Sequence, residues 1–168
     1  MIELVKAGER TYFFTGLFHV GLFLMSYDEV CLIDAGIDRE YAREMDELLI
    51  MKNWKVRLII NTHYHADHCG GSRYFQDKYK CKIYASGINA ALISDYEICP
   101  SIVWGAIPLN VLMNNYYYAD SCDAEDIRGK ELPEGLEVVA LPGHAISMIG
   151  IKTDDDVLFL GDAVVGEE

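Results

Sequence analysis

The early part of the chain alternates between short apolar runs and polar or glycine breaks. Residues 12–15, 17–25 and 30–33 are rich in aromatic and branched side chains, a pattern typical of β-strands. Gly16 separates the first two runs, and a polar turn at 27–29 separates the last two. This spacing predicts three strands with tight connections.

A helix is predicted after the third strand. Residues 32–36, with the sequence Leu-Ile-Asp-Ala-Gly, end a buried strand in a tight turn, and Asp38 has the side chain of a helix N-cap. Apolar side chains then recur at helical spacing on one face, at Tyr41, Met45, Leu48 and Leu49.

The later apolar runs follow strand and helix patterns in turn. We predict strands at 56–60 and 82–85 and a helix at 88–94, followed by an elaborated loop with some helix at 95–135. The chain then returns to strands, at 136–141, 148–153 and 157–160, with a hairpin turn at 154–156. This order predicts a mixed α/β (α+β) fold in one domain over residues 1–168.

Charge and hydropathy narrow the classes of partner. The chain has 168 residues, of which 51% are hydrophobic, and a formal net charge of −13. Such an acidic surface repels phosphate backbones and anionic lipids, so no nucleic acid and no membrane is expected as a partner. The longest apolar stretch, residues 16–25, is about half of the roughly 20 residues that a membrane helix needs.

The cysteines and the first residues indicate a cytoplasmic protein. Five cysteines are an odd number and form no CxxC pair, which argues against a disulfide framework and against a cysteine zinc cluster. Glu3 and Glu9, without a small-residue cleavage site, argue against a signal peptide. Cys69 is interpreted as a small buried residue and not as a metal ligand.

Ligand-type residues gather where predicted strands end. His63, His65, Asp67 and His68 lie in one short string after the strand at 56–60, and the later strands lead to His144 and Asp162. Imidazole and carboxylate groups suit zinc and similar divalent metals. His63 and His65 point the same way if the segment is extended, whereas Asp67 and His68 lie on the turn that follows. A lone histidine such as His19, among apolar neighbours in a predicted strand, is interpreted as having no metal role.

At these residues the sequence resembles the metallo-β-lactamase-fold superfamily. The matching segments are residues 32–36, 62–68 with the following glycine pair, 142–144 and 161–162, in the family's order. The resemblance implies a four-layer αββα sandwich with metals at one edge between the two sheets.

The resemblance also implies a role for each residue of the motif. His63, His65 and His144 resemble the ligands of a first metal, Asp67 and His68 resemble ligands of a second, and Asp162 resembles the carboxylate that bridges both. Asp34 resembles the residue that supports the metal loop from behind. The implied cofactor is one or two zinc ions, with iron or manganese as the alternative.

The sequence departs from the family pattern in two places. The histidine that often follows the Pro-Gly-His turn is absent, because Ala145 to Met148 occupy those positions. The family's last histidine, which completes the second metal site, is also absent, since the sequence stops at Glu168. We therefore expect a fold whose second half is incomplete, a weak second metal site, and exposed apolar surface that favours self-association.

The implied activity is a metal-dependent hydrolysis of a small molecule. In this mechanism a metal-bound hydroxide attacks an ester, thioester, lactone or lactam-type substrate, and Asp67 orients the nucleophile and accepts its proton. The tyrosine-rich stretch around Tyr116 is a candidate lining of the substrate cleft, or a packed surface loop. The alternatives are a mononuclear-iron redox member resembling persulfide dioxygenases, a catalytically impaired fragment, and a nuclease, which the net charge disfavours.

Overall fold

Among the residues that the structure describes, seven strands form the larger of two sheets. The structure, a computed structural model, describes residues 2–105 and 109–164. The strands follow one another across the sheet in chain order, antiparallel from β1 to β4 and parallel from β4 to β7. Their bounds are β1 (Leu4–Lys6), β2 (Thr11–Phe14), β3 (Val20–Leu24), β4 (Glu29–Ile33), β5 (Lys55–Ile60), β6 (Lys82–Ala85) and β7 (Ala124–Asp126).

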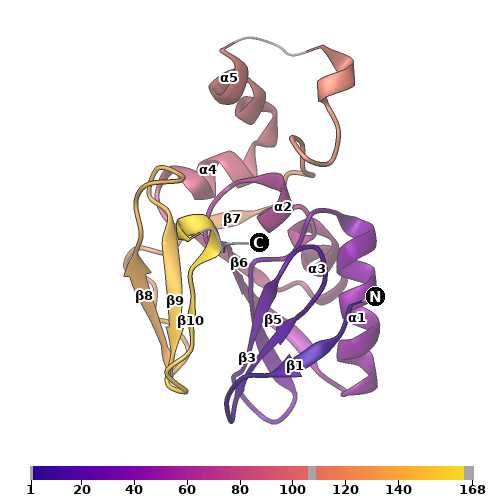
Figure 1. The fold of residues 1–168 in the computed structure, drawn as a ribbon, viewed down its shortest axis with the longest axis vertical. Coiled ribbons are helices and arrows are strands. Elements are labelled where there is room, and N and C mark those ends of the chain that lie inside the picture. Colours follow the sequence, from indigo (N-terminus) through magenta and orange to yellow (C-terminus); the bar gives the residue numbers. More distant parts are fainter. Residues whose placement is uncertain (1, 106–108, 165–168) are drawn as a thin grey trace.

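The second sheet has three antiparallel strands and faces the first. It consists of β8 (Leu136–Ala140), β9 (Ile149–Thr153) and β10 (Leu158–Phe159), with β9 in the middle. Ile149 and Ile151 pack with Phe23 and Ile60 of the larger sheet in one buried cluster. Figure 1 shows the two sheets side by side, with β8 to β10 in orange and yellow.

Helices cover the other face of the larger sheet. They are α1 (Arg39–Met51), α3 (Ser72–Tyr79) and α4 (Ile88–Ser94), and their apolar side chains form a second buried cluster with Leu32 and Ile59. Because side chains alternate along a strand, neighbouring residues of β4 and β5 serve opposite clusters. The described residues therefore supply three layers: helices, the large sheet and the small sheet.

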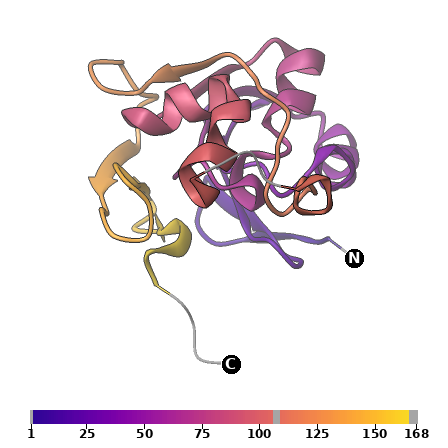
Figure 2. The same ribbon diagram turned by 90° about the horizontal axis from the view of Figure 1, so that it is seen from above.

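A helical segment stands away from these layers. It contains η1 (Tyr96–Ile98), α5 (Cys99–Trp104) and η2 (Asn110–Leu112), and it connects α4 to β7. Figure 1 shows it above the sheets, and in the view from above it lies over the middle of the body (Figure 2). No helix in the described ranges is long and apolar enough to cross a membrane.

The fold class predicted from the sequence is confirmed, and most element bounds agree within a few residues. Asp38 caps α1 as predicted, since its carboxylate accepts a hydrogen bond from the Tyr41 amide at 2.8 Å. The strand predicted at 17–25 begins only at Val20, because residues 16–18 form a bend that leaves Leu17 exposed. The elements β1, α2 (Ala66–Cys69), α3, β7 and η3 (Gly161–Ala163) were not predicted. Each is short, and α3 buries only two of its residues, so its apolar pattern is weak.

Candidate metal centre

Three loops bring the ligand-type residues to one edge between the sheets. The first loop leaves the end of β5, carries His63 and His65, and enters α2 (Ala66–Cys69) with Asp67 and His68. The second loop joins β8 to β9 and carries His144, and Asp162 lies in η3 (Gly161–Ala163) after β10. The carboxyl ends of parallel strands are where such open sheets place ligands.

The first group consists of three histidines and one carboxylate. His63, His65, His144 and Asp162 each offer one ligand atom, and these atoms all lie within 4.8 Å of one another. Nδ1 of His65 lies 2.9 Å from Nε2 of His144, and the ring centroids of His63 and His65 are 4.6 Å apart. The arrangement has the donor types and the convergence of a zinc site.

The second group adjoins the first and shares Asp162 with it. Asp67, His68 and Asp162 also offer ligand atoms within 4.8 Å of one another. Nε2 of His68 lies 3.0 Å from Oδ1 of Asp162, and Oδ2 of Asp162 lies 3.3 Å from Nε2 of His144. The Asp162 carboxylate thus stands between the two groups.

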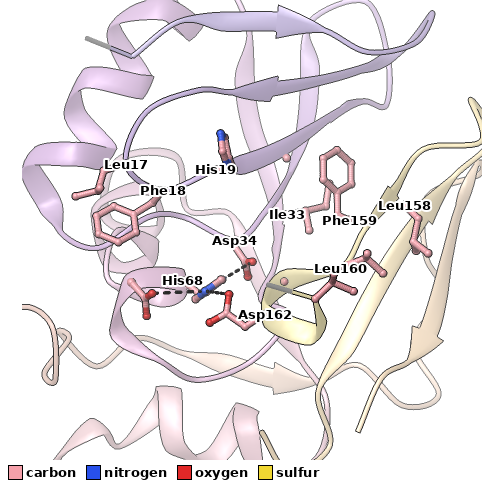
Figure 3. Close-up of a pocket in the computed structure, with 14 residues that line it drawn as sticks. Leu17, Phe18, His19, Ile33, Asp34, His68, Leu158, Phe159, Leu160 and Asp162 are labelled. Atoms are coloured by element: carbon pink, nitrogen blue, oxygen red, sulfur yellow. Dashed lines mark hydrogen bonds and ion pairs between the residues drawn. The ribbon is translucent and has the colours of Figure 1, made fainter. Parts of the chain in front are cut away.

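Asp34 holds both groups from behind. It is buried, and its backbone is left-handed with φ 68°, a conformation that aspartate tolerates better than most residues. Its carboxylate accepts hydrogen bonds from the Thr62 amide at 2.7 Å and from Nδ1 of His68 at 2.8 Å. Figure 3 shows His68 between Asp34 and Asp162. A carboxylate on the far nitrogen of an imidazole fixes its tautomer and orientation toward a metal.

The hydrogen bonds of Thr62 assign the tautomer of His63. The Thr62 hydroxyl lies 2.9 Å from Asp34 Oδ2 and 3.0 Å from His63 Nδ1. A carboxylate only accepts, so the hydroxyl proton goes to Asp34 and the hydroxyl oxygen accepts the Nδ1 proton of His63. Nε2 of His63 is therefore unprotonated, and it is buried without a hydrogen-bond partner in the described part of the chain.

This orphaned nitrogen is the test of whether a metal fits here. A buried polar atom without a partner costs about 1–3 kcal/mol. Nε2 of His63 is within reach of the imidazoles of His65 and His144, and a cation among them would satisfy all three. The residues present therefore fit a divalent metal ion.

The electrostatics of the centre's own side chains are strongly asymmetric. Burial and the neighbouring imidazoles lower the pKa of His63 to about 2, so its ring stays neutral. Burial alone would lower the pKa of His68 too, but the carboxylates of Asp34, Asp162 and Asp67 raise it to about 11. The hydrogen bond from His68 lowers the pKa of Asp162 to about 2. The three carboxylates around His68 thus stabilise positive charge at this position.

The structure brings together all seven residues singled out from the sequence. The backbone conformation that brings His63 and His65 together differs from the predicted one. The sequence predicted that His63 and His65 lie on an extended segment. Instead β5 ends at Ile60, and a bend followed by the start of α2 turns the two rings together. The role of Thr62 was not predicted, because its only signal in the sequence was its place beside His63.

His19 was predicted to lie in a strand among apolar neighbours, and this placement is wrong. It lies exposed just before β3, at the rim of a hollow of about 570 Å³ that also reaches Asp34, Asp67 and Asp162. His19 belongs to neither ligand group found among the described residues. The expected exposed apolar side chains are present at this hollow, where Leu17 is 77% and Val164 is 65% exposed.

Comparison with known proteins adds an independent observation. A family model described as "Metallo-beta-lactamase superfamily" matches residues 23–168. Several curated relatives are named hydroxyacylglutathione hydrolase, including one from Nitrobacter hamburgensis and one from Rhodopseudomonas palustris. The one from Nitrobacter hamburgensis is 32% identical over 142 residues, covering 84% of this chain and 47% of the relative. The one from Rhodopseudomonas palustris is 26% identical over 131 residues, covering 77% of this chain and 42% of the relative.

A solved structure shows the same fold. Rm3 metallo-beta-lactamase superposes with a TM-score of 0.70 at 23% identity, covering 89% of this chain and 55% of that one. The chain spans about half the length of the curated relatives that it matches.

Proposed function

Because this chain belongs to the metallo-beta-lactamase superfamily, we propose that it is a metal-dependent hydrolase whose centre is the cluster between the sheets. The observation that carries the proposal is the buried Nε2 of His63, which has no hydrogen-bond partner among the described residues and whose ring is grouped with two further imidazoles and a carboxylate. Hydrogen bonding among the described residues leaves this atom unsatisfied, whereas a bound cation would satisfy it.

We propose a ligand role for each of the six residues in the two groups. His63, His65 and His144 would hold a first ion, Asp67 and His68 a second, and Asp162 would contact both. Zinc suits these nitrogen and oxygen donors, and iron or manganese is the alternative. These residues would hold an ion that, when bound, would lower the pKa of a water molecule to about 7 and polarise the bond to be cleaved.

Two aspartates would act from the chain itself. Asp67 has its side chain 31% exposed at the mouth of the centre, where its carboxylate can orient a water molecule and accept a proton. Asp34 is a positioning residue, because its carboxylate is hydrogen-bonded to His68 and Thr62 and it belongs to neither ligand group.

We propose an ester, thioester, lactone or lactam-type substrate, with a thioester as the first to test. Two relatives that share most of this chain's length are named hydroxyacylglutathione hydrolase, and that name supports a thioester. The match covers less than half of those relatives, so the activity of the whole protein is part of the proposal.

Elemental analysis together with a thioesterase assay tests the function. We expect the purified chain to contain zinc, and His65→Ala to lose both the metal and thioester hydrolysis. His19→Ala is the matched control, because His19 lies near the centre but outside both ligand groups, and it should keep its metal. Unchanged metal content in His65→Ala would contradict the proposal. Iron in place of zinc in the purified chain would favour the redox alternative.

A further inference from the structure

A second cavity opens beside the metal centre, on the side of the projecting helical segment. Its volume is about 230 Å³, and His65 and Asp67 form its inner edge. Its walls are four tyrosines with one cysteine and one valine: Tyr64, Tyr96, Tyr116, Tyr117, Cys99 and Val103. Pockets that hold a whole drug-sized ligand measure roughly 300–1,000 Å³, so this one has room for one arm of a molecule.

The walls are apolar and uncharged. Cys99 and Tyr96 are buried, and burial raises the pKa of Tyr96 far above its ordinary value, so its hydroxyl stays neutral. None of the described residues that line the cavity is a lysine or an arginine. The Asp67 carboxylate at the inner edge and the net charge of −13 both oppose an anionic ligand.

The aromatic walls are supported from outside and open to solvent at one end. Trp104 packs edge-on against Tyr117 with ring centroids 5.6 Å apart, and Tyr118 packs in the same way against Tyr96 at 5.7 Å. Tyr116 and Val103 are 58% and 51% exposed. A ligand group can therefore enter between α5 and the loop that follows β5 without unfolding either segment.

We propose that this cavity binds an uncharged apolar arm of the substrate, a short alkyl or aryl group, next to the bond that is cleaved. The inference rests on the proposed hydrolase function, since it assigns the neighbouring centre to the reaction. Its physical basis is that apolar surface is buried against aromatic walls, while a carboxylate or phosphate seated among those walls would lose hydration without gaining a cationic side chain from the described lining residues.

Binding of unreactive carbonyl compounds tests the cavity without any need for hydrolysis. The probes are methyl ketones with propyl, pentyl and heptyl chains, titrated into the 168-residue chain and followed by NMR shifts of residues around Tyr117. We expect affinity to rise with each added methylene, by about fourfold at most. The heptyl ketone carrying a terminal carboxylate should bind at least tenfold more weakly than the neutral compound. Equal binding of the two, or tighter binding of a trimethylammonium analogue, would overturn the inference.

Two valines on the projecting segment provide a matched pair of variants. Val103 lines the cavity, whereas Val111 is 75% exposed and is not part of its lining. We expect Val103→Asp to bind the heptyl ketone at least tenfold more weakly than the parent chain, and Val111→Asp to bind it with unchanged affinity. Both sites are exposed, so neither change should unfold the protein. Equal loss or equal retention in the two variants contradicts the assignment.

The two proposals fail in different ways. If thioesters are not hydrolysed but ketones bind with the expected dependence on length and charge, the hydrolase proposal fails and the apolar cavity stands. If thioesters with short and long acyl chains are hydrolysed with the same kcat/KM and the ketones bind without length dependence, the hydrolase stands and the inference fails.

Discussion

Asp34 shows how one buried side chain positions two others. Its left-handed backbone at φ 68° turns the carboxylate toward the loop after β5, where it contacts Thr62 and His68. Through Thr62 it also determines which nitrogen of His63 is free. A neutral side chain of the same shape should therefore preserve the fold and disturb the two histidines.

The first prediction is that Asp34→Asn weakens metal binding about 10–100-fold, the usual cost of losing a carboxylate behind a ligating histidine. Asparagine tolerates the left-handed backbone, but its amide nitrogen cannot accept the Thr62 and His68 hydrogen bonds. Competition with a chelator measures the affinity, and circular dichroism checks the fold. Asp38→Asn is the control, because asparagine caps a helix as well as aspartate. Parent-like affinity in Asp34→Asn would contradict the positioning role.

The second prediction concerns the two ligand groups. The group of Asp67, His68 and Asp162 offers only one nitrogen and shares its last carboxylate, whereas the other group holds three imidazoles. We therefore expect calorimetric titration of the metal-free chain with zinc to show one tight ion, with a second bound weakly or not at all. Two ions bound with equal affinity would refute this difference between the groups.

At the scale of elements, the ligand loop is held against the turn after β4 by direct backbone contact. The Ala35 amide donates to the His68 carbonyl at 2.7 Å, and the Gly71 amide donates to the Gly36 carbonyl at 3.2 Å. Gly70 and Gly71 both have helical backbone angles that any residue can adopt. Glycines are needed here because two backbone segments lie in direct contact. A Cβ on Gly70 would lie 1.8 Å from the Ile37 carbonyl oxygen.

The third prediction is that Gly70→Ala destabilises the protein by about 3 kcal/mol or more, since the clashing atom belongs to the backbone and cannot move aside. Urea denaturation of the metal-free protein measures the loss in the free energy of unfolding. Gly143→Ala is the matched control in another ligand loop, because a Cβ there would meet nothing within 4 Å. Similar stability of the two variants would show that the close approach carries no energetic weight.

At the scale of the whole molecule, the centre depends on how the small sheet docks on the large one. His144 and Asp162 come from the small sheet's loops, and the hairpin between β9 and β10 ties that sheet down at its far end. The Asp155 carboxylate accepts hydrogen bonds from the Thr11 hydroxyl at 2.6 Å and from the Arg10 amide at 2.9 Å. The sequence predicted only a turn here, because its partners lie far away along the chain.

The fourth prediction is a pH dependence that belongs to Asp155. The Thr11 hydroxyl and the backbone amides of Arg10 and Glu9 lower its pKa in the folded state. The unfolded chain therefore takes up this proton first as the pH falls below about 4, so the stabilisation is present at neutral pH and is lost in acid.

Asp155→Asn should accordingly lower stability at pH 7 and flatten its decline in acid, as measured by urea denaturation across that range. Asp156→Asn serves as the control, because the Asp156 side chain is 90% exposed and its ion pair with Lys152 is a surface one. If the stability of Asp155→Asn fell as steeply in acid as that of the parent chain, the hydrogen bonds of Asp155 would not be the cause of the pH dependence.

The sequence alone determined which donor types gather at the candidate centre and most of the elements that carry them. Donor types are a local property, and so is the alternation of side chains that sent Leu32 and Ile33 to opposite clusters, so both could be predicted from neighbouring residues. The tertiary structure decided how these parts meet. Three sets of contacts join residues that are distant in the chain. They are the hydrogen bonds of Thr62 with Asp34 and His63, the close approach of Gly70 to Ile37, and the hydrogen bond between Thr11 and Asp155. Such contacts depend on packing between elements, which no local pattern encodes.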